Sequence, residues 1–336
     1  MMASPNLIGI GSGLVAAVLF ASLANNTLLA ILLFYLTPMP VLLAGIGWGA
    51  RAALLSTITA VLLLGLVQSF QTAIGFALYI GLPGLLLSYL FLLHRIVQPD
   101  EAAAGDAASG QAAVEWYPLG RIVAWAALIA GGLTSLGMLL MGGDSDSYRN
   151  AVRALFDEEA MKQLQAVLGP DFGPAEMERF VERFTRFILP IFAAGFWLIV
   201  MIGNMWLAAK SAAISGLLAR PAFNLIRVEY PPFLLAGFFA AVGLGLTSGM
   251  LGLISTAFAG AIGTAFLILG LAVIHVSLAR SPIKLLVLFG LYFGLFLTPW
   301  LAPVIMIIGL AEPFLQLRER QWRRMSSTAN GAGPHF

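Results

Sequence analysis

The sequence contains no cysteine and very little charge. Without Cys there is no disulfide framework, no thiol nucleophile and no thiolate metal site. Only 10% of the 336 residues are charged, whereas a soluble domain carries about 25%. Hydrophobic residues make up 60% of the chain, and its mean hydropathy is +0.93. This composition cannot form a water-soluble surface, so we expect a membrane protein.

Sequence motifs of common catalytic chemistry are also missing. There is no GxxxxGK[ST] loop for ATP hydrolysis, no HExxH helix and no GxSxG elbow. The glycines between Gly9 and Gly13 open an apolar run instead of following a strand, which argues against a nucleotide-binding loop. The net charge is only +2 and the basic residues form no single patch, so nucleic acid is not an expected partner. We expect no enzymatic activity, no cofactor and no metal site.

Apolar runs long enough to cross a bilayer recur along most of the chain. They are continuously apolar and rich in Leu, Ala and Gly, which favours helices over the alternating strands of a barrel. The predicted fold is all-α, a polytopic helical membrane bundle of about ten hydrophobic segments. Nine or eight segments are alternatives. The last two are either a hairpin of short spans or one long bent helix, and that choice decides between ten and nine. The segments are 7–24, 28–49, 52–67, 72–93, 119–141, 186–209, 232–250, 253–279, 283–297 and 301–317.

The basic residues predict the orientation, since Lys and Arg accumulate in short cytoplasmic loops. If the N-terminus is inside, twelve of the 18 Lys and Arg residues are cytoplasmic. The other six lie in the long segment 142–186, together with nine acids. We therefore predict a bacterial cytoplasmic (inner) membrane protein with both termini in the cytoplasm and the lipid bilayer as its partner. The twelve are Arg51, Arg95, Arg121, Lys210, Arg220, Arg227, Arg280, Lys284, Arg318, Arg320, Arg323 and Arg324.

Composition divides the chain into four parts. Residues 1–95 hold the first four membrane helices. Residues 96–118, which are rich in Ala, Gly and acids, are predicted to form a flexible cytoplasmic linker. Residues 119–317 hold helices five to ten and the external segment 142–186, and residues 318–336 form a basic, disordered cytoplasmic tail.

The external segment carries two amphipathic patterns. Asp146 or Ser147 is predicted to cap a first helix over 147–168. A second helix over 174–187 follows Gly173 and is expected to continue into the sixth span. Apolar stripes of this kind suit the membrane interface or the top of a bundle.

Small residues and prolines mark two features of the early helices. Gly9, Gly13, Ala17 and Ala21 recur every four residues and form a smooth face, along which helices pack or dock closely. Pro38 and Pro40 interrupt the second apolar run and remove two backbone donors. We expect this span to be broken into two half-helices, which either line a cavity or form a kink covered by neighbours.

Polar residues within or near the spans are mainly amides. Asn25, Asn26, Gln68 and Gln71 are expected at the outer ends of the first four helices, where they either converge on a pocket for a neutral or zwitterionic ligand or form polar turns. Asn204 and His275 are expected to bond between helices in the interior.

No Asp or Glu lies well inside a predicted span, which argues against a self-powered pump. Any energy for transport must then come from a partner or a gradient.

Three sequence stretches resemble a known family. They are LFYLTPMPVLLAGIGWGARAAL, with its paired prolines, AVIHVSLARSP and IIGLAEPFLQLRER. The chain resembles the YybS-like family, bacterial multi-pass membrane proteins of unknown function. That family is in turn distantly similar to the substrate-binding S components of energy-coupling-factor transporters. The resemblance implies a helical bundle with a ligand pocket near its outer face and docking to a coupling subunit through small residues of early helices.

Two functions follow as hypotheses. The first is a substrate-binding or transport-associated membrane component that lacks its own ATPase and binds a small molecule or a lipid. The alternative is a non-transporting envelope scaffold that binds a partner through the external helices of residues 147–187.

Overall fold

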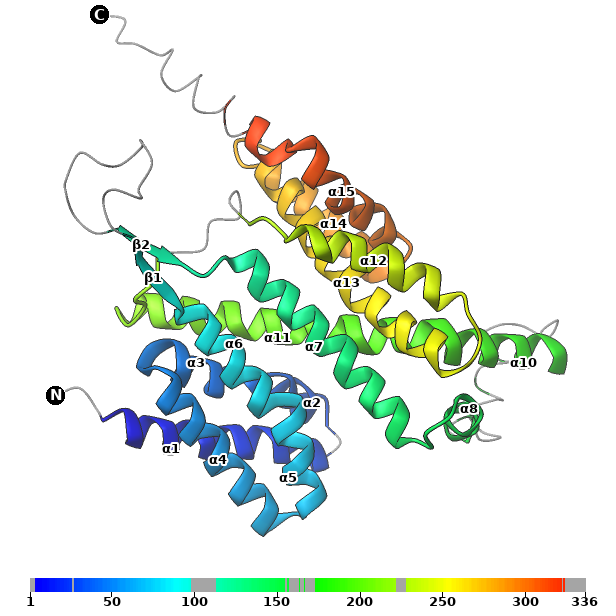
Figure 1. The fold of residues 1–336 in the computed structure, drawn as a ribbon, viewed down its shortest axis with the longest axis horizontal. Helices are drawn as coiled ribbons and strands as arrows, with labels where there is room; N and C mark the ends of the chain where they lie inside the picture. Colours follow the sequence, from blue (N-terminus) through cyan, green and yellow to red (C-terminus); the bar gives the residue numbers. More distant parts are fainter. Residues whose placement is uncertain are drawn as a thin grey trace, which may run out of the picture. The chain divides into compact units, whose positions relative to one another are not determined.

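The structure is a computed structural model that describes residues 4–25, 27–97, 113–154, 156, 163, 166, 173–221, 228–321 and 323. The described chain is almost entirely helical (Figure 1). It forms two compact units, Met1–Ala126 with Ile199–Phe223 and Ala127–Leu198 with Asn224–Phe336. The second stretch of the first unit was not expected from the division at residues 96–118.

Within the described residues, seven helices are long and apolar enough to cross a membrane. The shortest has 18 residues, or about 27 Å at 1.5 Å per residue, close to the ~30 Å of a hydrocarbon core. The prediction of a helical, multi-pass membrane protein is confirmed at this level. The seven are Pro5–Ala24, Leu28–Trp48, Ala50–Val67, Phe70–Leu92, Leu119–Leu140, Ala175–Ile214 and Gly249–Ser277.

Three further apolar helices cover Pro232–Gly245, Lys284–Leu297 and Leu301–Leu315. With 14 or 15 residues, each is only about 21–23 Å long. These ten helical segments coincide with the ten apolar runs of the sequence. Because three of them are shorter than the hydrocarbon core, a topology of ten spans stays a prediction.

The first unit contains four apolar helical segments joined by tight turns. Its elements are α1 (Pro5–Ala21), η1 (Ser22–Asn25), α2 (Leu28–Tyr35), α3 (Pro38–Trp48), α4 (Ala50–Val67), α5 (Phe70–Phe76), η2 (Ala77–Gly81), α6 (Leu82–Leu92), β1 (His94–Val97), β2 (Ala113–Trp116), and parts of α7 (Leu119–Leu140) and α11 (Leu189–Ile214). Ala17, Val41, Leu64 and Phe76 belong to its buried core, so α1, α3, α4 and α5 enclose one apolar centre.

The second unit is assembled around α13. It contains the rest of α7 and α11, with α8 (Ser145–Arg153), α10 (Pro174–Arg183), η4 (Phe184–Ile188), α12 (Pro232–Gly245), α13 (Gly249–Ser277), α14 (Lys284–Leu297) and α15 (Leu301–Leu315). A Cβ on Gly270 of α13 would overlap the backbone of Ile305, and one on Gly309 of α15 would overlap the backbone of Phe266. The two helices therefore cross in backbone contact, which only glycine permits at these positions.

The ends of the predicted flexible linker are structured, which corrects that expectation. β1 and β2 pair antiparallel, with His94 opposite Trp116 and Arg95 opposite Glu115. Arg95 Nε donates to Glu115 Oε2 over 2.6 Å, and the His94 and Trp116 rings lie 4.9 Å apart. Cross-strand pairs of this kind hold a short ladder that composition alone does not reveal. Residues 98–112 between the strands lie outside the described part.

The predicted cap of the first amphipathic helix is wrong, because Asp144 and not Asp146 or Ser147 caps α8. The Asp144 carboxylate accepts from the amides of Asp146 and Ser147 and from Ser147 Oγ, over 2.9, 3.0 and 2.7 Å. These bonds, that of the Ser147 hydroxyl first, lower the pKa of Asp144. Most of residues 155–172 lie outside the described part, so the predicted extent of this helix to 168 is not tested.

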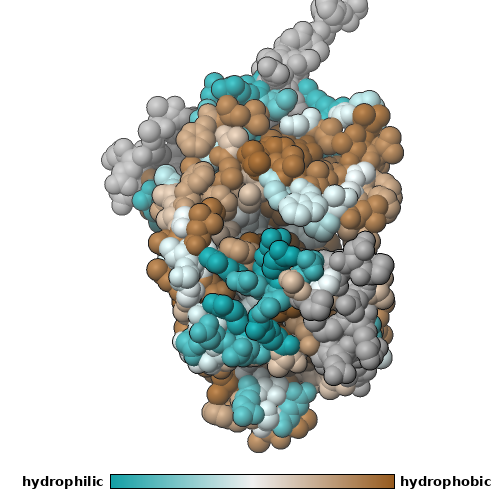
Figure 2. Space-filling model, turned by 90° about the vertical axis from the view of Figure 1, so that its right-hand side faces the viewer, coloured by the Kyte–Doolittle hydropathy of each residue, from teal (hydrophilic) through white to brown (hydrophobic). Residues whose placement is uncertain are grey.

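The second amphipathic helix begins as predicted. Gly173 precedes α10, which continues through η4 into α11 as one apolar stretch from Ala175 to Ile214. Tyr148 and Val152 of α8 are buried, as are Met177 and Val181 of α10. Figure 2, which looks onto this end of the second unit, shows hydrophilic side chains gathered beside apolar ones. The polar face includes Arg149, Arg153, Glu176, Glu178 and Arg179, which form ion pairs at exposed positions.

The beginning of the predicted disordered tail is also structured. Residues 317–321 are helical, and Arg318 is only 4% exposed. The predicted boundary at residue 318 therefore divides a folded segment. Residues 324–336 lie outside the described part.

Candidate functional site

The second span is interrupted where the prolines predict it. Since Pro38 and Pro40 have no N–H, the carbonyls of Phe34 and Leu36 lose their usual helical donors. Thr37 replaces the lost donor of the Phe34 carbonyl. Its amide donates to Phe34 O over 3.0 Å and its hydroxyl over 2.6 Å. The Met39 amide donates to Leu36 O over 3.0 Å. α2 therefore ends at Tyr35 and α3 begins at Pro38.

This rearrangement also changes the bonding of the Tyr35 carbonyl. Its usual helical donor would be the Met39 amide, which is bonded to Leu36 instead. Asn204 of α11 supplies the missing donor, because its Nδ2 lies 2.8 Å from Tyr35 O and also 2.8 Å from Val200 O. Asn204 is 4% exposed. Its Oδ1 has no hydrogen-bond partner among the described residues.

The small-residue face of α1 packs against α4. A Cβ added to Gly9 would lie 2.7 Å from Ala52 O, and one added to Gly13 would lie 2.5 Å from Ser56 O. Positions 9 and 13 thus face positions 52 and 56, so α1 and α4 run parallel. Ala17 is buried and Ala21 is half-buried on the same helix.

The outer amides are placed only in part. Asn26 lies outside the described residues, as does the side chain of Asn25. Gln68 ends α4 and Gln71 lies in the first turn of α5, and both side chains are exposed. Between them, Ser69 caps α5 by accepting from the Thr72 amide over 3.1 Å. The structure thus places the two glutamines beside one turn.

His275 lies in the second unit, near the end of α13. Its Nδ1 lies 2.8 Å from Leu271 O, and its Nε2 lies 3.5 Å from the hydroxyl of Tyr292. The second contact links α13 to α14, and His275 is half-buried. Among the described residues, no three His, Asp or Glu side chains group as a metal site would require.

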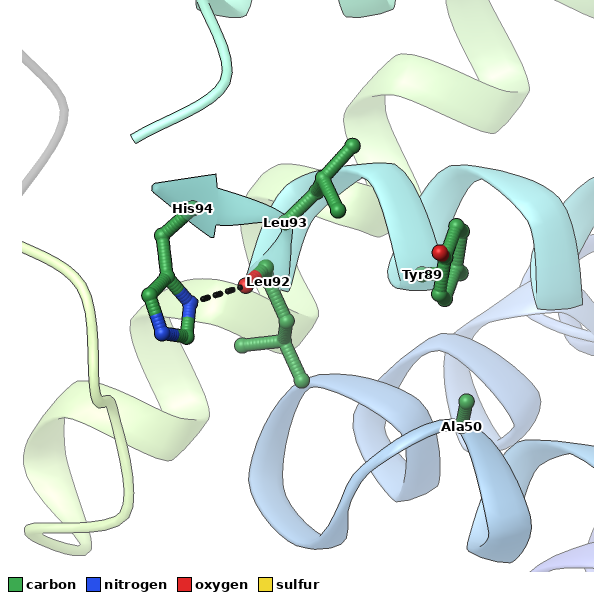
Figure 3. Close-up of a pocket in the computed structure, with 5 residues that line it drawn as sticks. All are labelled: Ala50, Tyr89, Leu92, Leu93 and His94. Atoms are coloured by element: carbon green, nitrogen blue, oxygen red, sulfur yellow. Dashed lines mark hydrogen bonds between the residues drawn. The ribbon is translucent and has the colours of Figure 1, made fainter. Parts of the chain in front are cut away.

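Two side chains bond the last carbonyls of α6. Helices leave their last carbonyls without intrahelical donors, and here Arg220 Nη1 donates to Phe91 O over 3.3 Å, with its guanidinium 5.1 Å from the Phe91 ring. His94 Nδ1 lies 2.9 Å from Leu92 O (Figure 3). Burial lowers the pKa of Arg220. The bonds from Arg220 and His94 therefore hold the end of α6, from which the β1–β2 hairpin starts.

Two adjoining cavities lie at this helix end. The smaller, of about 190 Å³, is lined by Ala50, Tyr89, Leu92, Leu93 and His94 (Figure 3). The larger, about 530 Å³, is here called the hairpin basin, and it shares Leu93 and His94 with the first. Neither cavity includes a residue predicted as a ligand contact. The basin is lined by Leu93, His94, Arg95, Glu115, Trp116, Tyr117, Pro118 and Arg121.

Sequence reasoning also missed a buried ion pair in the second unit. Glu312, in the last turn of α15, accepts from Arg318 Nε over 2.7 Å, and both side chains are 5% exposed. The carboxylate also accepts from the amides of Leu317 and Arg318, over 2.9 and 3.2 Å. Arg318 Nη2 donates to Val228 O over 2.6 Å. The pair terminates α15 at Gln316, whose φ is 49°.

These features define the class of the chain, a polytopic helical membrane protein with one interrupted span and a structured hairpin between two spans. Comparisons with protein-family models, with curated proteins and with solved structures find no match. The resemblance to the YybS-like family and to S components therefore rests on the sequence motifs alone.

Proposed function

We propose that the chain is a substrate-binding or transport-associated component of a bacterial cytoplasmic membrane, without an ATPase of its own. The observation that carries this proposal is the interruption between α2 and α3, where Asn204 bonds the Tyr35 carbonyl and its buried Oδ1 has no partner among the described residues. Discontinuous helices are where many membrane carriers bind their substrates. The proposal includes ten spans and both termini in the cytoplasm.

The chemistry of Asn204 suggests the kind of ligand. Its Oδ1 is only an acceptor, so the ligand must present a hydroxyl, amide or ammonium hydrogen. A buried polar atom without a partner costs about 1–3 kcal/mol, which a donor on the ligand would recover. Glu115 is the only acid in the described part of this unit, which favours a neutral or zwitterionic molecule over a simple cation.

Gln68 and Gln71 are proposed as further ligand contacts at the outer end of the helices. Their exposure leaves their amides available to a ligand that arrives from that side. The α1 face from Gly9 to Ala21 is proposed as a packing or docking face, and Gly9 and Gly13 already use it against α4. A coupling subunit is the proposed source of energy.

Native mass spectrometry of the protein extracted with its lipids tests the proposal. We expect a co-purifying small molecule or subunit in the wild type and loss of the small molecule in Asn204→Ala, with recovery in Asn204→Gln. The double variant Gln68→Leu/Gln71→Leu should lose the small molecule without loss of thermal stability. Retention in both Asn204→Ala and the double variant would contradict the site assignment, and a wild type without any associated molecule would contradict the function.

A scaffold is the second candidate, favoured by the polar face of α8 and α10 (Figure 2). This face is held firmly, because Tyr148 donates to Thr185 O over 3.5 Å and Arg186 donates to Leu246 O over 2.9 Å. In this proposal the face lies outside the membrane and binds a protein. Arg149→Ala with Arg179→Ala should then abolish capture of a crosslinked partner and leave small-molecule retention unchanged. The opposite pattern supports the transport-associated component.

A further inference from the structure

The hairpin basin lies between the ends of two apolar helices. α6 ends at Leu92 and α7 begins at Leu119, and both belong to segments long enough to cross a membrane. The basin residues, 93–95, 115–118 and 121, therefore occupy the level at which a lipid bilayer meets water. A ligand at this level can place a polar group in the basin while its hydrocarbon part stays along the helices.

Aromatic side chains surround the basin at the same level. Trp116 and Tyr117 line it, and Tyr89 lines the adjoining cavity (Figure 3). Trp125 Nε1 donates to the Tyr117 hydroxyl over 3.1 Å. Tyr89 and Trp125 are 49% and 45% exposed. Trp and Tyr are enriched where headgroups meet acyl chains, since their rings are apolar and their edges polar.

The charge in the basin is positive. Within the described part of the chain, Arg95 bonds Glu115 through Nε only, and the side chain of Arg121 forms no ion pair or hydrogen bond. Over the whole first unit, the described residues carry five cations and the single acid Glu115. The five are Arg51, Arg95, Arg121, Lys210 and Arg220. Asp100, Glu101 and Asp106 lie outside the described residues.

We propose that the hairpin basin binds the phosphate group of an anionic phospholipid. Arg121 is the phosphate-binding cation, with the free terminal nitrogens of Arg95 as the second donor group. Trp116 and Tyr117 contact the glycerol region, and the acyl chains pass along α6 and α7. The basin is large enough for a headgroup, and its combination of guanidinium donors with interfacial aromatics fits a lipid better than a soluble anion, which gains nothing from the aromatic rings.

Native mass spectrometry of the full-length protein provides the test. The protein is equilibrated in mixed micelles with equal amounts of phosphatidylglycerol and phosphatidylcholine, and the retained lipids are counted. We expect the wild type to prefer phosphatidylglycerol, and Arg121→Gln to lower that preference about fivefold, since one basic residue at a lipid surface contributes roughly that factor. Trp116→Ala should weaken retention of both lipids. Lys210→Gln is the matched control, an exposed cation of the same unit that lines neither cavity.

Three results would overturn the proposal. An equal loss in Lys210→Gln and Arg121→Gln would mean that the preference reflects general positive charge. An unchanged preference in Arg121→Gln would exclude the basin. Displacement of the retained lipid by millimolar inorganic phosphate or glycerol phosphate would assign the basin to a soluble phosphoester. The expected result is resistance to both soluble competitors, because neither supplies acyl chains.

Discussion

Arg318 and Glu312 form an ion pair with a nitrogen–oxygen distance of 2.7 Å, although each side chain is only 5% exposed. Two desolvated charges are stable only when further hydrogen bonds satisfy them. Here the amides of Leu317 and Arg318 donate to the carboxylate, and the guanidinium donates to Val228 O. The pair thereby connects the end of α15 to the chain that precedes α12.

Removal of one partner of this pair should strongly destabilise the protein. Arg318→Met leaves the Glu312 carboxylate buried without its cation, which costs about 3–5 kcal/mol. The double variant Glu312→Gln/Arg318→Met should recover part of the loss, since Gln carries no charge and its single oxygen still accepts from one of the two amides. Unfolding by SDS in mixed micelles measures both. The exposed pair Glu319–Arg323 is the control, and its loss should cost at most about 1 kcal/mol.

Substitution of Asn204 should destabilise the first unit. Asn204→Ala leaves the Tyr35 carbonyl without its donor, at an expected cost of about 1–2 kcal/mol. Gly203→Ala is the control on the same helix, because an added Cβ there meets nothing within 4 Å. The SDS midpoint should fall for Asn204→Ala only. Equal midpoints for the two variants would mean that the bond to Tyr35 contributes nothing.

The small-residue face of α1 makes a paired prediction. Gly13→Ala places a methyl group against the Ser56 carbonyl and Thr59, so α1 and α4 must separate, at a cost of about 1–3 kcal/mol. Gly11→Ala lies on the same helix and meets nothing within 4 Å, so its higher helix propensity should leave stability unchanged or raise it. Thermal unfolding in detergent distinguishes the two. If the unfolding temperature fell as much in Gly11→Ala as in Gly13→Ala, the close contact of Gly13 with α4 would be refuted.

High pH should weaken the attachment of α8 to η4. Burial raises the pKa of Tyr148 from 10.0 to about 12, so the folded protein keeps this hydroxyl neutral where the unfolded chain ionises it. The stability that the neutral Tyr148 hydroxyl contributes to the folded protein is therefore complete below pH 10 and is lost as the pH rises through about 12. Tyr148→Phe should remove this part of the pH dependence. The test is to compare the thermal unfolding midpoints of the wild type and Tyr148→Phe from about pH 8 to about pH 12.

Much of the fold could be predicted because hydrophobic runs determine where membrane helices form. All ten apolar runs are helical, and Pro38 and Pro40 end α2 because the chemistry of proline is local. The hairpin was missed for the opposite reason. Its strands are four residues long and separated by an Ala- and Gly-rich stretch, so only the pairing of Arg95 with Glu115 reveals it.

For the candidate sites, the sequence shows which polar residues stand out but not which groups they contact. Asn204 stood out as a polar residue in an apolar helix, but its partner is a backbone carbonyl 169 positions earlier, which no spacing indicates. Glu312 was passed over because it lies near a helix end, where acids are common at the surface. Its burial depends on Arg318, a residue predicted to begin a disordered tail.

The bond between Asn204 and Tyr35 also bears on how the protein is made. A ribosome releases the broken second span long before residue 204 is synthesised, so the Tyr35 carbonyl must enter the bilayer without its final donor. Chains truncated before α11 should consequently be recognised as incomplete by membrane quality control, even though all four N-terminal hydrophobic segments are present.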